Sequence, residues 1–121
     1  MKITRRQLVA RVRHWRTRLN LDDWDIYVSI RNPGDGDDAE CDAEPQYKRA
    51  TIRFNLDQVP ADELDGFVAH ELCHCPLEKL GRLALAWAGD DPIKQRIVLE
   101  TEDEAVTHFE RVVVALAKRQ A

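Results

Sequence analysis

The amino-acid sequence predicts a single α+β domain in which a short sheet packs against helices. Two patterns support this prediction. Apolar residues recur at helical spacing near the N-terminus and again after residue 60, and they alternate with polar residues in the segments between. The 121 residues fit one domain, and no internal repeat or linker divides them. A composition of 44% apolar and 33% charged residues is ordinary for a globular protein and disfavours a disordered chain.

The first half of the chain is expected to form one helix followed by three strands. Residues 4–19 carry apolar side chains at steps of three and four, namely Leu8, Val12, Trp15 and Leu19. Residues 24–30 and residues 50–56 alternate between apolar and polar side chains, which is typical of strands with one buried face. The weaker alternation of residues 39–44 indicates a strand at the edge of the sheet.

The second half of the chain is expected to be helical. A helix begins near Pro60 and continues until Pro76, which should end or kink it because proline lacks the backbone N–H of a helix interior. Residues 77–87 then form a second apolar helical piece. Asp91 suits the N-cap of a final helix, with Pro92 as its first residue and its end near residue 118.

Residues 70–74 read His-Glu-Leu-Cys-His, a pattern with a specific chemical meaning. His70 and His74 are four residues apart, so a helix places both imidazoles on one face, where they can bind the same zinc ion. Glu71 leaves the helix beside His70 and can act as the general base toward a water molecule. Two core histidines without a metal are the alternative, which is disfavoured because burying these polar groups is costly.

A catalytic zinc site needs a third protein ligand, and the final helix offers several candidates. Glu104 is the expected ligand, because it lies at the centre of a stripe at helical spacing made of Ile97, Thr101, Glu104, His108 and Val112. Glu100 is the main rival, and His108 is expected in a supporting catalytic role beside the ligands. Glu102 and Asp103 project away from this stripe and are expected to be solvated. The alternative is that the whole acidic segment is a solvated helix face, stabilised by the helix dipole.

The three cysteines indicate a reducing compartment. Cys73 and Cys75 lie two apart on a predicted helix and could not bridge without distortion, so with Cys41 they are expected to be free thiols. Both are interpreted as small buried apolar residues rather than zinc ligands. The chain starts without the apolar core of a secretory signal, and no apolar run approaches the roughly 20 residues of a membrane-spanning helix. We therefore expect a cytoplasmic protein without a membrane partner.

Residues 21–116 resemble the minimal zincin-like metallopeptidases of the gluzincin type, particularly small phage and prophage domains. The resemblance is carried by residues 24–28, 50–54, 67–74 and 104–106, of which only the His-Glu-x-x-His part is sharp. It implies a Zn²⁺ cofactor and a three-stranded sheet over an active-site helix. A later helix would supply a glutamate ligand, matched here by Glu104. The chain is also similar, more distantly, to SprT-like proteases, which use a third histidine that His108 would have to supply.

Charge is distributed unevenly along the chain, although its net value is −4. Residues 1–21 hold seven Lys or Arg and no acid, whereas residues 22–45 hold nine acids and one Arg. The basic helix could attract a nucleic acid. Neutralisation by the acidic segment is favoured instead, and no aromatic residues alternate with the arginines to stack on bases.

These observations predict a zinc-dependent metallopeptidase that acts on a protein or peptide substrate. The edge strand at residues 39–44 could bind an extended peptide by strand addition. The alternative is a zinc-binding accessory or interaction module without catalysis, which would act near nucleic acid or be associated with a phage. The sequence decides neither the oligomeric state, nor the substrate, nor zinc against another divalent ion.

Overall fold

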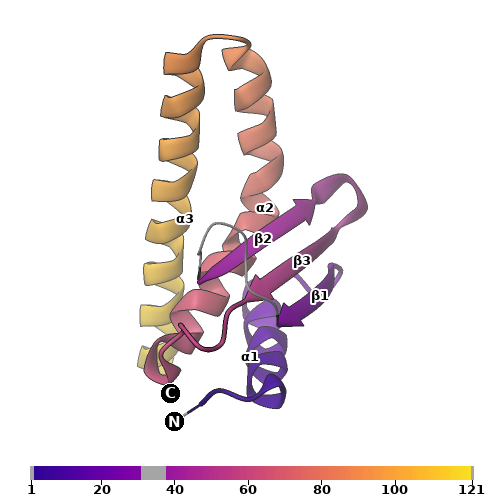
Figure 1. Ribbon diagram of the computed structural model, residues 1–121, viewed down its shortest axis with the longest axis vertical. Coiled ribbons are helices and arrows are strands. Elements are labelled where there is room, and N and C mark those ends of the chain that lie inside the picture. The colour runs from indigo at the N-terminus through magenta and orange to yellow at the C-terminus, as the bar shows by residue number, and fades with distance from the viewer. Residues whose placement is uncertain (1, 31–37, 121) are drawn as a thin grey trace.

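A computed structural model describes residues 2–30 and 38–120 of the chain. The described residues form three α-helices and a three-stranded sheet, which confirms the predicted α+β class. Helix α2 is the central element, because it contacts α1, α3 and strand β2. Figure 1 shows α2 between the sheet and α3, with the far halves of α2 and α3 projecting beyond the sheet as a helical hairpin.

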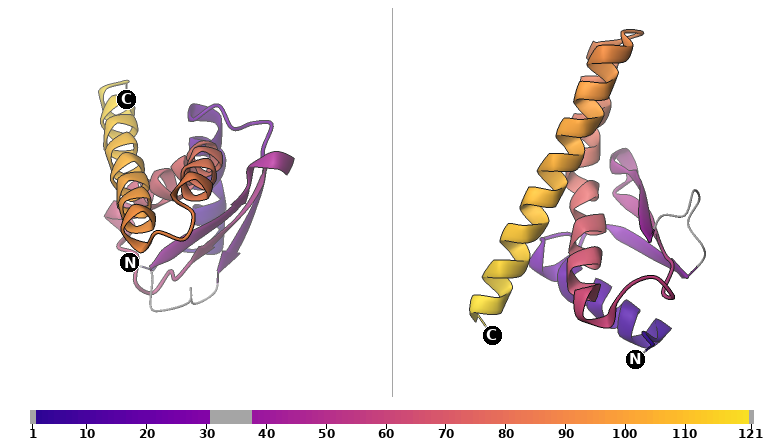
Figure 2. Two further views of the ribbon diagram at one scale, coloured as in Figure 1. Left: turned by 90° about the horizontal axis from the view of Figure 1, so that it is seen from above. Right: turned by 60° about the vertical axis from the view of Figure 1, so that its left-hand side comes forward.

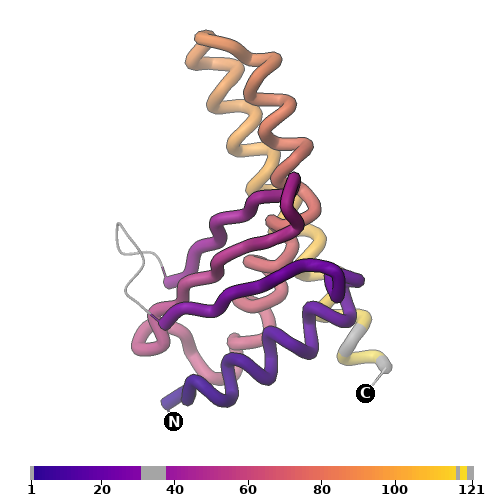
Figure 3. The backbone as a smooth tube through the Cα atoms, turned by 90° about the vertical axis from the view of Figure 1, so that its right-hand side faces the viewer, coloured from indigo at the N-terminus to yellow at the C-terminus, as the bar shows by residue number. Residues whose placement is uncertain are grey.

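Helix α1 spans Arg5–Arg18, close to the predicted bounds. It begins in a capping box, in which the Thr4 side chain accepts a hydrogen bond from the Gln7 backbone and the Gln7 side chain accepts one from the Thr4 backbone. The apolar stripe of the sequence is its inner face, with Leu8, Val12 and Trp15 buried. Figure 3 shows α1 running past the sheet beside β1.

The sheet consists of β1 (Asp25–Ile30), β2 (Ala39–Glu44) and β3 (Arg49–Phe54), in the order β1-β3-β2. Strand β3 pairs parallel with β1 and antiparallel with β2, which precedes it in the chain and is joined to it through a short 3-10 turn at Pro45–Tyr47. The alternation in β3 buries Ala50, Ile52 and Phe54, as expected. Strand β2 pairs only with β3 among the described strands, so the prediction of an edge strand is confirmed.

Helix α2 spans Leu64–Ala88 without a break, preceded by a 3-10 turn at Ala61–Glu63. The expectation of two separate helical pieces is therefore corrected, because the helix continues through Pro76. A proline removes one backbone hydrogen bond, and the packing of α2 along α3 on both sides of Pro76 compensates for that loss. Gly89 ends the helix with a φ of +59°, a conformation that favours glycine.

Helix α3 spans Pro92–Gln120, and Asp91 caps it by accepting hydrogen bonds from the backbone N–H groups of Ile93 and Lys94. Its inner face contains the fully buried Val106. Figure 2 shows α3 running antiparallel to α2, on the side of α2 away from most of the sheet. None of the described helices is long and apolar enough to cross a membrane.

Candidate metal centre

The His-Glu-x-x-His segment lies in the first half of α2, where the helix passes beside the sheet. Helical spacing places His70 and His74 one turn apart, each with about a quarter of its side chain exposed. Glu71 points toward the sheet side of the helix and is only 5% exposed. Glu71 is therefore not a solvated surface carboxylate.

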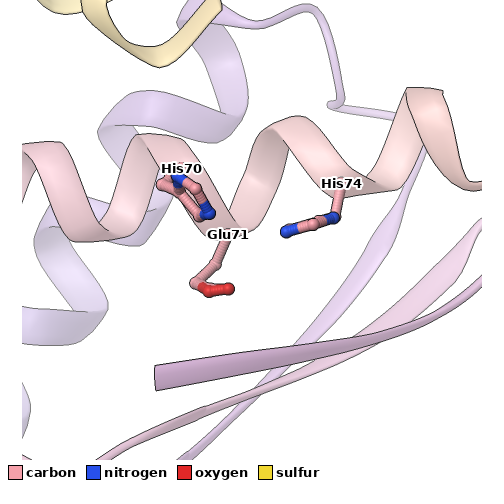
Figure 4. Close-up of side chains that lie close together, drawn as sticks. All are labelled: His70, Glu71 and His74. Atoms are coloured by element: carbon pink, nitrogen blue, oxygen red, sulfur yellow. The ribbon is translucent and has the colours of Figure 1, made fainter. Parts of the chain in front are cut away.

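The three side chains converge as the sequence predicts. One ligand atom from each of His70, Glu71 and His74 lies within 4.8 Å of the other two, so the group could hold a metal ion. Figure 4 shows a ring nitrogen of each histidine directed toward the space that it shares with the Glu71 carboxylate. Two imidazoles and one carboxylate are the donor types that divalent transition metals prefer.

Two carboxylates of α3 face the remaining nitrogens of the histidines. His70 Nδ1 lies 3.9 Å from Glu110 Oε1, and His74 Nδ1 lies 3.8 Å from Glu102 Oε1. Both glutamate side chains are mostly buried, with exposed fractions of 21% and 17%. A carboxylate beside Nδ1 orients an imidazole so that its Nε2 is presented to a metal, which is the usual outer partner of a histidine ligand.

The electrostatic setting of this site follows from its burial. Desolvation lowers the pKa of His74, and the neighbouring His70 lowers it further, so the neutral ring is favoured. Burial likewise raises the pKa of Glu102, with Glu78 and Asp103 adding to the shift. The site therefore lies in a partly dehydrated and acidic region between α2 and α3.

A cavity of about 770 Å³ opens beside the convergent group, between β2, the first half of α2 and α3. His70, Glu71 and His74 line one wall. The lining is strongly acidic, because eight of its described residues carry carboxylates and Lys118 is its only Lys or Arg. Strand β2 contributes Ala39, Glu40 and Cys41, so an edge strand borders the cavity.

The structure does not bring Glu104 or His108 to this group. Both are exposed, and neither lines the cavity. Glu100 is also exposed and pairs with Arg96 at 3.8 Å. The helix face chosen from the sequence is corrected here, since the face of α3 toward α2 passes through Glu102, Val106 and Glu110. The ligand role of Glu104 stays a prediction that this arrangement does not support.

The same correction applies to Glu102, which was expected to be solvated but is mostly buried beside His74. Asp103 is exposed, as expected, and lines the cavity. Glu110 was not among the residues considered from the sequence. It could have been found by stepping four residues in each direction from Val106, which gives Glu102 and Glu110 on one helix face.

All three cysteines are free, as expected, and Cys73 and Cys75 are buried. No pattern in the sequence predicts that Cys41 of β2 lies against Cys75 of α2. The hydrogen bond between these thiols, together with burial, raises the pKa of Cys41 strongly. Burial raises the pKa of Cys73 to about 11. Protonated thiols are poor metal ligands, which agrees with the interpretation of these cysteines as packing residues.

The basic residues of the first 21 positions are partly neutralised within the chain. Arg11 binds Asp65 at 2.6 Å, and Arg16 lies 3.8 Å from Asp22 of the acidic segment. These contacts are the intramolecular neutralisation that the charge distribution suggested. Comparisons of the chain with protein-family models, with curated proteins and with solved structures found no match.

Proposed function

We propose that this chain is a zinc-dependent metallopeptidase in which His70 and His74 hold the metal and Glu71 is the general base. The observation that carries the proposal is the convergence of these three side chains within 4.8 Å at the wall of an open cavity. The residue types and their helical spacing fit zinc, which prefers imidazole nitrogen and carboxylate oxygen. The zincin-like fold belongs to this proposal, supported by a sheet that lies along the helix of the motif.

The residues of α3 complete the proposed site. Glu102 and Glu110 would position the two imidazoles through their Nδ1 atoms. Asp103 lines the same cavity as the histidines and is not one of these two positioning residues, so it is the carboxylate of α3 that we propose for the third ligand in place of Glu104. A bound zinc ion would lower the pKa of water and polarise the carbonyl group of a substrate.

Glu71 would move the proton in this reaction. Its carboxylate accepts a proton from the attacking water, and the same proton passes to the nitrogen that leaves when the peptide bond breaks. The position of Glu71 suits this task, because it lines the cavity and its carboxylate lies within 4.8 Å of a ligand atom of each histidine.

The walls of the cavity indicate the kind of substrate. Strand β2 borders the cavity and has one unpaired edge among the described strands, so an extended peptide could add to it by backbone hydrogen bonds. The acidic lining would attract peptides that carry Lys or Arg and repel acidic ones. A mixture of basic peptides is therefore the first substrate to test.

A second function is favoured by the same geometry. The Glu71 carboxylate lies as close to the histidines as a ligand would, so Glu71 could itself be the third ligand of a non-catalytic metal-binding module. The two functions differ in what the Glu71 side chain does. A general base is needed only for hydrolysis, whereas a ligand is needed for metal affinity.

The substitution Glu71→Gln separates the two, with metal content and hydrolysis of basic peptides as the measurements. In the metallopeptidase, the variant keeps one zinc per chain and loses hydrolysis. In the binding module, the variant loses zinc affinity and the wild type hydrolyses nothing. Glu104→Gln is the matched control, because Glu104 is an exposed glutamate away from the cavity. A wild-type chain that binds no divalent metal, even after zinc is added, would refute both functions.

A further inference from the structure

The projecting hairpin of α2 and α3 carries a large apolar surface that no described residue covers. On α2 it includes Leu80 and Trp87, and on α3 it includes Ile93 and Ile97, which are four residues apart. We call this surface the hairpin face. Its large side chains are 55–71% exposed: Leu80, Leu83, Trp87, Ile93 and Ile97.

The hairpin face lies on the opposite side of the helix pair from the candidate metal centre. Two hollows share Gly81 and Glu102, which form the seam between α2 and α3. One of them is bordered by Cys41 of the sheet and by His74. The other contains Leu80 and Ile97 and no residue of the sheet. The seam therefore separates the hairpin face from the metal site.

The second hollow gives the face a shape that an apolar side chain can fill. It measures about 260 Å³, and small residues form its centre, because Gly81 and Ala84 of α2 lie opposite Thr101 and Ala105 of α3. Leu80, which is 64% exposed, stands at its rim. A protruding leucine next to a hollow is the arrangement by which helices of a bundle interlock.

We propose that the hairpin face is covered by the same face of a second copy of this chain, which forms a four-helix bundle with two-fold symmetry. In such an interface each copy supplies both the protruding side chain and the hollow, and the hairpin face contains both. Five large apolar side chains, each exposing on the order of 120 Å², provide roughly 600 Å² per copy, or about 1,200 Å² over both copies, which is the lower end of the range for a specific interface. Monomers rarely expose an apolar patch of that size.

Charged residues at the edges of the hairpin face also favour a second copy of the chain as its partner. Lys79 is exposed on α2, one turn before Leu83, and Glu100 and Glu104 are exposed on α3. A two-fold arrangement that lays α2 of one copy along α3 of the other brings these unlike charges together. The exposed position of Glu104 then has a structural explanation, at the edge of an interface rather than at the metal.

The test is the molar mass of the wild-type chain, measured by light scattering and sedimentation over a range of concentrations. We expect twice the chain mass of 14.0 kDa. The double substitution of Leu80→Lys and Ile97→Lys should raise the dissociation constant at least ~100-fold, because symmetry places each new charge in the interface twice. Both positions are exposed in the single chain, so circular dichroism should show an unchanged fold.

Leu99→Lys is the matched control. Leu99 is a comparably exposed apolar residue of α3, at 54%, but it borders the hollow on the sheet side. We expect this variant to remain a dimer. A wild type at the mass of one chain would overturn the proposal, and binding of that monomer to lipid vesicles would assign the face to a membrane surface instead. A double variant that stays dimeric would also overturn it.

Discussion

The contact between α1 and the start of α2 allows a quantitative prediction. Asp65 accepts hydrogen bonds from Arg11 Nε at 2.6 Å and from Trp15 Nε1 at 2.8 Å. Trp15 is only 2% exposed, so Asp65→Ala leaves its N–H buried without an acceptor, at a cost of about 1–3 kcal/mol. The lost ion pair with Arg11 adds less than ~1 kcal/mol, because both side chains are more than one-third exposed. We expect a total loss of about 2 kcal/mol.

Urea denaturation and thermal melting measure this loss directly. For a chain of this size, each kcal/mol corresponds to roughly 3–5 °C in Tm, so the variant should melt about 6–10 °C lower. Asp62→Ala is the control, since Asp62 is exposed nearby and forms no ion pair among the described residues. An Asp65→Ala variant within ~0.5 kcal/mol of the wild type would show that the Trp15 N–H has another partner.

The same carboxylate predicts a dependence on pH. Burial raises the pKa of Asp65, but the hydrogen bonds from Trp15 and Arg11 outweigh it, and the net pKa is lowered. A lowered pKa contributes stability that is fully present above the unfolded pKa of about 3.9 and is lost as pH falls through the folded pKa. The wild type should have a larger free energy of unfolding than Asp65→Asn at neutral pH, and this difference should shrink below about pH 4. A difference that grows as the pH falls would contradict the lowered pKa of Asp65.

Three further predictions concern α2. Gly66→Ala should raise the free energy of unfolding in urea by about 0.5–1 kcal/mol, because glycine within a helix is less stable than alanine. The new Cβ would meet no atom within 4 Å, so no clash offsets this gain. Gly81→Ala should lack this gain, because its Cβ would collide with the Glu102 carboxylate. With a pKa of about 11, Cys73 should react with iodoacetamide at least ~100-fold more slowly than an ordinary thiol until the protein is unfolded. A chelator should lower the Tm of the wild type but leave that of His70→Ala unchanged.

The elements that the sequence predicted well are those in which one face is buried and the other is solvated. Helix α1 and strand β3 show that simple pattern, and the structure buries the expected residues Trp15 and Phe54. The His-Glu-x-x-His group was also predictable, because helical geometry alone places its members together. Strand β2 was recognised as an edge from its weak alternation.

Helix α3 was oriented incorrectly because it is apolar on two faces. A stripe with Ile97 and Val112 at its ends was interpreted as buried, although Ile97 is exposed on the hairpin face and Val112 is exposed nearer the C-terminal end of α3. Hydrophobic periodicity identifies an apolar face but does not say whether the chain itself covers it. The contact of Cys41 with Cys75 was equally hidden, since it depends on the placement of β2 against α2.

The order of strands in the sheet has a consequence for how the chain folds as it is synthesised. Strand β1 pairs with β3 and not with β2. Its first paired residue, Asp25, therefore cannot join the sheet until Arg49 has been synthesised. Strands β2 and β3 are joined by a short turn and can close as a hairpin within microseconds. The central strand is thus the last of the three to leave the ribosome. The sheet is completed just before α2 emerges, so the histidines enter the fold against a surface that is already in place.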